Sequence, residues 1–133
     1  MEQTLVLIKP DAIKRRLVGK ILSYYEENHL EIKAIKLVNP SLPLLSKHYK
    51  EHADKSFYND LIFFMLSGPS IAMILEGESA IFKVRNINGN TDPAEADMGT
   101  IRGDLGENKN KNLVHGSDSI ESAEREIKIW FES

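Results

Sequence analysis

The sequence predicts an α+β sandwich, in which a four-stranded antiparallel sheet is covered by helices. Short β-prone apolar runs alternate with segments whose apolar residues recur at helical spacing, in the order strand, helix, strand, helices, strand, helix, strand, helix. Two strand-helix-strand units in series are typical of a ferredoxin-like sandwich. Because 133 residues is the size of one domain, we expect residues 1–133 to form a single folded unit.

The first strand is expected at residues 4–8, a continuous apolar run that is stopped by Pro10. Such a run is typical of a central strand covered on both faces. A helix is then expected over residues 12–25, where apolar residues recur at helical spacing. Asp11 is a candidate cap for this helix, and Gly19 is a weak point within it.

The middle of the chain predicts two strands and a pair of helices. Residues 30–34 alternate between apolar and polar side chains, and the phase then slips at residues 35–37, which indicates a bulge or an edge strand that leaves the core. Residues 42–66 have the pattern of two short helices joined around residues 55–58. Residues 70–75 form the third expected strand, bounded by glycine and proline.

The last third of the chain predicts a helix at residues 79–87, a region with little periodicity at residues 90–111, and a short strand at residues 113–114. A final helix follows, with Asp118 and Glu121 placed as a capping box. Its apolar face consists of Ile120, Ala123, Ile127, Trp130 and Phe131.

Composition excludes several functional classes. The formal net charge of −3 gives no general case for nucleic-acid binding, and the small basic clusters are better explained as solvated faces. The absence of cysteine excludes disulfides and thiolate zinc sites, and it fits a reducing compartment. The first apolar run is too short for a signal peptide or a membrane span. We therefore expect a cytoplasmic protein with no membrane contact.

The strongest candidate for chemistry is His115, which ends a short apolar run and precedes Gly116. An imidazole can act as a base, a metal ligand or a nucleophile near neutral pH, and a glycine lets backbone and substrate approach closely. Other groups suited to phosphate are a lysine at a strand end, two arginines and an expected helix start: Lys9, Arg85, Arg102 and Thr91. Together they suggest phosphoryl transfer.

Three other chemistries find less support. The pair Gly19-Lys20 lacks the remaining glycine and the hydroxyl of a Walker A motif, which excludes a P-loop kinase. Ser117 lacks the Gly-x-Ser-x-Gly pattern of a nucleophile elbow, because Ser119 occupies its last position. His48 and His52 stand four residues apart and could share a metal ion, but the sequence offers no third ligand.

Five segments follow one another in the order of a known family pattern: residues 4–11 (Thr-Leu-Val-Leu-Ile-Lys-Pro-Asp), 67–69 (Ser-Gly-Pro), 99–104 (Gly-Thr-Ile-Arg-Gly-Asp), 112–119 (Asn-Leu-Val-His-Gly-Ser-Asp-Ser) and 121–124 (Glu-Ser-Ala-Glu). Taken together, they resemble the nucleoside diphosphate kinase family. The resemblance extends from Thr4 to Phe131, and such a set of motifs in this order is highly specific.

The resemblance implies a ping-pong enzyme that moves the γ-phosphoryl group of a nucleoside triphosphate onto a histidine and then onto a nucleoside diphosphate. This reaction would maintain NTP and dNTP pools. Mg²⁺ would be carried on the nucleotide phosphates, and the protein would be a homo-oligomer, either a tetramer or a hexamer. Base discrimination should be low, because stacking on an aromatic ring accepts any base.

The resemblance also implies residue roles. His115 matches the nucleophile. The residues that match phosphate-binding positions are Lys9, Arg85, Thr91 and Arg102, while Asn112 matches the ribose contact and Phe57 the ring on which the base stacks. Tyr49 and Glu126 match neighbours that position the imidazole, Ser117 lies beside it, and Asp118 is expected to reach the metal through a water molecule.

The sequence departs from the family pattern at Leu105, at Asp92 and at Asn110-Lys111. An extra carboxylate at Asp92, close to the phosphate site, predicts weaker nucleotide binding unless it caps a helix.

Two alternatives to the enzyme remain at this point. One is a nucleotide-binding or regulatory module of the same fold that does not turn over, and the presence of His115, Lys9 and Arg102 argues against it. The other is a histidine phosphocarrier that a partner protein phosphorylates. Phe57 argues against the carrier, because a carrier needs no platform for a base.

Overall fold

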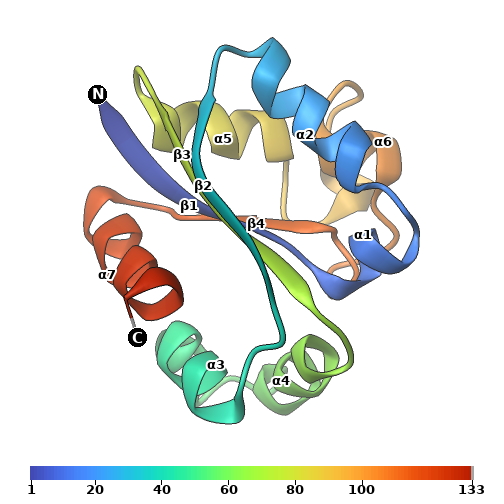
Figure 1. The fold of residues 1–133 in the computed structure, drawn as a ribbon. Helices are drawn as coiled ribbons and strands as arrows, with labels where there is room; N and C mark the ends of the chain where they lie inside the picture. The colour runs from blue at the N-terminus through green and yellow to red at the C-terminus, as the bar shows by residue number, and fades with distance from the viewer. Residues whose placement is uncertain (133) are drawn as a thin grey trace.

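The computed structural model describes residues 1–132, which form an antiparallel sheet with helices on both faces (Figure 1). The strands are β1 (Glu2–Ile8), β2 (Glu31–Val38), β3 (Ser70–Gly77) and β4 (Val114–Gly116). They lie in the order β2-β3-β1-β4, and each neighbouring pair is antiparallel. The predicted ferredoxin-like sandwich with a four-stranded antiparallel sheet is confirmed.

The helices divide between the two faces of the sheet (Figure 1). On one face lie α1 (Pro10–Lys14), α2 (Val18–Glu27), α5 (Ala80–Asn88) and α6 (Ile101–Leu105), and on the other lie α3 (Leu42–His48), α4 (Tyr58–Leu66) and α7 (Ile120–Phe131). The 3-10 helices η1 (Lys50–His52) and η2 (Pro93–Glu95) lie in connections. None of the helices within residues 1–132 is long and apolar enough to cross a membrane.

Strand β1 lies inside the sheet, as its continuous apolar run predicted. Leu5 and Leu7 belong to the apolar cluster beneath α3, α4 and α7, whereas Val6 and Ile8 belong to the cluster beneath α1, α2 and α5. All four side chains are fully buried. Since its side chains enter both clusters, β1 joins the two halves of the core. Burial of each such side chain contributes about 1.5–3 kcal/mol to the stability of the fold.

The single helix expected over residues 12–25 is wrong, because the structure has two helices there. Arg16, between α1 and α2, has a φ angle of 60°, in the left-handed region, and this conformation ends α1. Gly19 lies inside α2 and not at the break. Helical spacing of apolar residues continues across the break, so periodicity alone could not locate it.

Asp11 does not cap this helix, contrary to expectation. Pro10 occupies the first helical position, where its missing N–H costs nothing, so the helix begins two residues earlier than expected and Lys9 stands at the N-cap. The Asp11 carboxylate instead accepts a hydrogen bond from the backbone N–H of Leu113 (3.1 Å). It therefore joins the start of α1 to the chain that leads into β4.

Strand β2 forms an edge of the sheet, which was one of the two explanations for its slipped phase. The pairing with β3 is irregular between Ile32 and Ala34, slightly before the predicted position at residues 35–37. Beyond this irregularity Ile35 and Leu37 are 48% and 65% exposed. The alternation of apolar and polar residues is lost there because Ile35 and Leu37 do not pack into the core.

The two short helices predicted within residues 42–66 are confirmed as α3 and α4. Residues 90–111 are not only a loop, because they contain η2 and α6. Helix α6 is a short turn held by its cap, since the Thr100 hydroxyl accepts a hydrogen bond from the Gly103 N–H (3.0 Å). A helix of five residues is too short to show a helical pattern in the sequence.

Helix α7 begins at Ile120, but the expected capping box of Asp118 and Glu121 is wrong. Ser119 is the N-cap, and its hydroxyl accepts a hydrogen bond from the Ser122 N–H (3.0 Å). Asp118 therefore precedes the N-cap, and it lines a cavity beside the helix.

Two glycines are expected to respond oppositely to alanine. A Cβ atom at Gly103 would overlap the backbone carbonyl of Asp97, so Gly103→Ala should lower the free energy of unfolding by about 2 kcal/mol. A Cβ atom at Gly19 meets nothing within 4 Å, so Gly19→Ala should raise that energy by about 0.5 kcal/mol. Urea unfolding measures both. Equal stability of the two variants would contradict the close packing of α6.

Candidate active site

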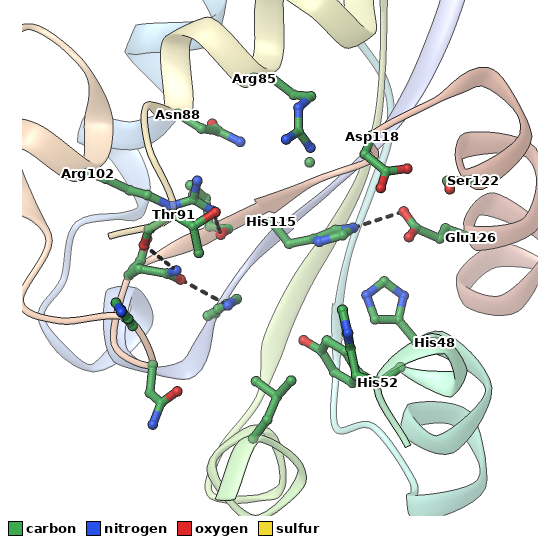
Figure 2. A pocket seen from close by; sticks show the side chains of 18 of the residues that line it. His48, His52, Arg85, Asn88, Thr91, Arg102, His115, Asp118, Ser122 and Glu126 are labelled. Atoms are coloured by element: carbon green, nitrogen blue, oxygen red, sulfur yellow. Dashed lines mark hydrogen bonds and ion pairs between the residues drawn. The ribbon is translucent and has the colours of Figure 1, made fainter. Parts of the chain in front are cut away.

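A cavity of about 620 Å³ opens beside edge strand β4 (Figure 2). The residues predicted for the site that line it are Lys9, Tyr49, Phe57, Arg85, Thr91, Arg102, Asn112, His115, Asp118 and Glu126. Ser117 does not line the cavity itself, but its hydroxyl donates a hydrogen bond to Glu126, which does. The size is ordinary for a site that takes a small organic ligand.

Strand β4 divides its side chains between the two faces of the sheet. Val114 belongs to the cluster on the α5 side, and a Cβ atom at Gly116 would lie 2.8 Å from Val84 of α5. His115 stands between them, and its ring contacts the other face, beside α3 and α7. Gly116 is thus required by the close approach of α5, and the cavity receives groups from both faces.

The His115 imidazole is held by a buried carboxylate. Its Nε2 lies 2.9 Å from Glu126 Oε1, and the Ser117 hydroxyl donates a 2.6 Å hydrogen bond to the same oxygen. Arg125 lies 3.7 Å from the second oxygen of Glu126. Figure 2 shows the His115 ring extended across the cavity toward Glu126, which comes from α7.

This contact fixes which ring nitrogen of His115 carries the proton. Burial alone would raise the pKa of Glu126, but hydrogen bonds from His115 and Ser117 and the nearby histidine charges lower it. An ionised carboxylate only accepts hydrogen bonds, so Nε2 of His115 is the protonated nitrogen. The lone pair then remains on Nδ1. An imidazole in this state is a competent nucleophile.

Arg102 is a buried cation that also binds three backbone carbonyls. Its guanidinium donates to the backbone carbonyls of Gly89 (2.8 Å), Asn112 (3.2 Å) and Val114 (2.6 Å). Burial, followed by the field of Arg85, lowers the pKa of Arg102 to about 10, so it remains cationic at neutral pH. A guanidinium has five N–H donors, and those not used on carbonyls can reach an anion.

Lys9 belongs to a short polar chain in the cavity wall. Its Nζ donates to Asn112 Oδ1 (2.9 Å), and the Asn112 amide donates to the backbone carbonyl of Thr91 (3.0 Å). Burial and the positive charge of Arg102 lower the pKa of Lys9 to about 8. Two cations are therefore held close together with little water, which is a strong attraction for a polyanion.

The chain between Asn112 and β4 is strained. Leu113 has a φ angle of 77°, which is unusual for a residue with a branched side chain. Its carbonyl accepts from Lys9 N (2.8 Å), and its N–H donates to Asp11. Strain of this kind persists only where the surroundings impose it. Asp11 thus supports the backbone of the site at Leu113. The sequence had predicted it as a helix cap instead.

Arg85 of α5 and Asp118 line the side of the cavity that lies across from Arg102 and Thr91 (Figure 2). A hydrogen bond from the Ser122 side chain and the nearby charge of Arg85 lower the pKa of Asp118. Asp118 is therefore an ionised carboxylate that the cavity exposes. Ser122 lies in the motif at residues 121–124, but its hydroxyl gives no separate signal in the sequence.

An aromatic group lies at the mouth of the cavity. Phe57 is 43% exposed, and its ring centroid lies 5.6 Å from that of His52. The hydroxyl of Tyr49 is buried and has no hydrogen-bond partner among residues 1–132. Burial raises the pKa of Tyr49, so its phenol keeps its proton and can donate to a ligand.

His48 and His52 do not form the metal pair that their spacing allowed. His48 Nδ1 accepts a hydrogen bond from the Trp130 indole (3.0 Å), and its ring packs 4.7 Å from the His115 ring. His52 lies beside Tyr49 and Phe57 instead. Sequence reasoning did not assign His48 to the site beside His115, because the two meet only through the folding of α3 against β4.

Of the residues that depart from the family pattern, Asn110 lines the cavity, whereas Asp92, Leu105 and Lys111 do not. Asp92 caps η2, since its carboxylate accepts from the Ala94 N–H (3.0 Å). This is the condition under which it was not expected to weaken nucleotide binding. Leu105 is the last residue of α6 and packs against the apolar core.

Comparison with known proteins gives a consistent result. The family model for nucleoside diphosphate kinase matches residues 2–133. A nucleoside diphosphate kinase of Caldanaerobacter subterraneus subsp. tengcongensis is 55% identical over 131 residues, which cover 98% of this chain and 94% of that protein. One from Cutibacterium acnes is 55% identical over 130 residues, with the same coverage.

Solved structures agree. The apo nucleoside diphosphate kinase from Encephalitozoon cuniculi superposes with a TM-score of 0.98 at 43% identity, covering 100% of this chain and 90% of that one. The Aquifex aeolicus nucleoside diphosphate kinase superposes with a TM-score of 0.95 at 41% identity, covering 98% and 94%.

Lys9 should make the stability of the fold depend on pH above neutrality. Its pKa is 10.5 in the free chain and about 8 in the fold. Between these values the unfolded chain binds more protons, so the free energy of unfolding should rise with pH, by about 2 kcal/mol from Lys9 alone. The destabilising contribution is fully present below pH 8.

Lys9→Met should remove this rise, whereas Lys14→Met, at an exposed position, should keep it. Denaturant unfolding from about pH 7 to about pH 10 measures the difference between wild type and each variant. Parallel curves for wild type and Lys9→Met would show that Lys9 is not buried as a cation.

Proposed function

The chain belongs to the nucleoside diphosphate kinase family of phosphotransferases, and we propose that it works through a phosphohistidine on His115 in a ping-pong reaction. The observation that supports this most is the contact between His115 Nε2 and Glu126. It leaves the Nδ1 lone pair available in a cavity whose wall carries Lys9 and Arg102. In the cell this reaction would maintain NTP and dNTP pools.

In the first half-reaction the Nδ1 lone pair attacks the γ-phosphorus of a nucleoside triphosphate. An N–P bond forms, the bond from the γ-phosphorus to the bridging oxygen breaks, and the diphosphate leaves with the electron pair on its β-phosphate. Nε2 keeps its proton, and Glu126 stabilises the positive charge that develops on the ring. The incoming diphosphate reverses these steps, so neither half-reaction requires a net proton transfer.

The cationic residues would stabilise the charge on the transferred group. Lys9 and Arg102 approach from one side and Arg85 from another, and Thr91 lies beside the Lys9-Asn112 pair. Pre-arranged charges of this kind need no reorganisation when the transition state forms. Since the same cations serve both half-reactions, donor and acceptor never meet as two polyanions in one cavity.

The remaining roles concern the nucleoside and the imidazole. We assign the ribose contact to Asn112 and the stacking of the base to Phe57, which offers an exposed aromatic face at the cavity mouth. Stacking without hydrogen bonds to base edges gives low base discrimination. Tyr49 can donate its unpaired hydroxyl, and Ser117 supports the carboxylate that orients His115.

Mg²⁺ carried on the nucleotide phosphates fits the residues present. The ion prefers oxygen ligands and is often bound through one or two carboxylates together with substrate phosphates. Asp118 supplies an ionised carboxylate at the cavity and would reach the ion through a water molecule. When bound, Mg²⁺ would neutralise charge on the phosphate oxygens.

We also place the protein in the cytoplasm and assign it a homo-oligomeric state, a tetramer or a hexamer. The exposed edge of β2 supports association, because Ile35 and Leu37 leave an apolar strip beside unpaired strand edges. Nothing in this assignment involves a membrane or a nucleic acid.

The first test is phosphoenzyme formation. Wild type mixed with Mg²⁺ and γ-labelled ATP should gain an acid-labile, alkali-stable label that unlabelled GDP removes as labelled GTP, and His115→Gln should gain none. Absence of label while nucleotide still binds would favour the module that does not turn over. A label supplied only by another phosphoprotein would favour the phosphocarrier.

The stacking role of Phe57 predicts a uniform loss. Phe57→Ala should raise the KM for ADP, GDP, CDP and UDP by similar factors, corresponding to about 1–3 kcal/mol of lost stacking. Phe63→Ala is the matched control, since Phe63 lies on α4, is 78% exposed and does not line the cavity. A loss confined to purines would contradict low base discrimination.

A further inference from the structure

The strongest feature that the proposed mechanism does not use is a second histidine beside the nucleophile. His48, at the end of α3, is only 4% exposed. Its ring meets the His115 ring nearly at right angles, with centroids 4.7 Å apart and an interplanar angle of 77°. The rings of Tyr49 and Trp130 pack against its other sides, at 4.5 and 5.6 Å.

Trp130 fixes the tautomer of His48. The indole Nε1 lies 3.0 Å from His48 Nδ1, and an indole N–H can only donate. Nδ1 must therefore carry a lone pair, which leaves the proton of the neutral ring on Nε2. Burial, reinforced by the charge of His115, lowers the pKa of His48 well below its ordinary value. His48 is thus a neutral ring with one defined donor.

A metal site formed by His48, His115 and Glu126 is a possible alternative, because one ligand atom from each lies within 4.8 Å of the others. A metal ion needs a free lone pair on each imidazole. In His48 one nitrogen accepts from Trp130 and the other is protonated, so the ring has no lone pair to offer. The cluster is therefore better explained by packing and hydrogen bonding.

We infer that His48, locked by Trp130, is a positioning residue for the nucleophile. Its ring supports the His115 imidazole edge-to-face and keeps Nε2 on Glu126, so that Nδ1 stays directed at the substrate. This inference rests on the proposed role of His115 as the phosphoryl carrier. Neither His48 nor Trp130 touches the transferred group.

The neutrality of His48 is part of this role. A cationic His48 would compete with His115 for the single carboxylate of Glu126 and would repel the positive charge that develops on the nucleophile. The charged or titratable groups around His48 are Glu126 and Arg125 from α7, His115 from β4, Lys9 from the end of β1, and Tyr49 and His52 from its own segment. Of these, Glu126 is the carboxylate that would favour a cation.

Trp130→Phe is the first variant, because it keeps an aromatic ring but removes the indole N–H together with part of the buried ring volume. Nδ1 of His48 then loses its donor, so both tautomers become accessible and protonation becomes easier. In single-turnover experiments we expect phosphorylation of His115 by ATP to slow about tenfold, with nucleotide Kd unchanged within about twofold. The acid limb of the pH profile should move to higher pH.

His48→Phe and the double variant complete the test. His48→Phe should also slow phosphorylation, but without the shifted acid limb, because the titrating ring is gone. If His48 and Trp130 act as one unit, the double variant should be no slower than the slower single variant. Nitrogen chemical shifts of labelled histidine should show Nδ1 of His48 unprotonated in wild type and mixed in Trp130→Phe.

Ile127→Val is the matched control, since it trims a side chain of α7 that packs against the same apolar cluster as Trp130. It should leave the phosphorylation rate and the pH profile as in wild type. Equal slowing in Ile127→Val and Trp130→Phe would overturn the inference in favour of simple packing, and an unchanged rate in Trp130→Phe would overturn it as well.

The outcomes also separate this inference from the proposed function. A wild type that never takes up label from ATP would overturn the phosphohistidine mechanism and, with it, the role of His48. A labelled wild type with an equally fast Trp130→Phe would overturn only the positioning role.

Discussion

The cavity depends on one buried cation that holds its wall together. Arg102 donates to the carbonyls of Gly89, Asn112 and Val114, so a single side chain joins the end of α5, the approach to β4 and β4 itself. Hydrogen bonds from a charged donor contribute about 1.5–3 kcal/mol each, and buried carbonyls left without a donor would add a further cost. The short helix α6, packed too tightly for any residue but glycine at position 103, serves to deliver this guanidinium.

The same arrangement leaves positive charge unbalanced. Burial and the charge of Arg102 lower the pKa of Lys9, and neither residue forms an ion pair with a carboxylate in the part of the chain that the structure describes. Such a wall is costly without an anion and becomes favourable when phosphates enter. The fold can sustain that cost because β1 carries a fully buried apolar cluster on each face.

The sequence predicted those elements and site residues whose pattern lies within a few neighbouring residues. The buried run of β1 and the motif around His115 could be interpreted from neighbouring residues. The break at Arg16 could not be predicted, because a left-handed φ angle at a charged residue has no compositional signal. Asp11 and His48 were likewise misassigned or left out, since their partners are about 100 and 80 residues away and meet only in the folded chain.

The two faces of the sheet contribute separate parts of the site, and edge strand β4 brings them together. The cations that we propose to bind phosphate come from the α5 and α6 side and from the end of β1, whereas Glu126 and Trp130 come from α7 on the other side. His115 projects toward the second side, while Val114 and Gly116 pack against the first. In the proposed reaction, phosphate binding and the orientation of His115 would therefore depend on different packing contacts, so a change on one face could alter one without the other. An interior strand could not do this, because neighbouring strands would separate the two groups of side chains.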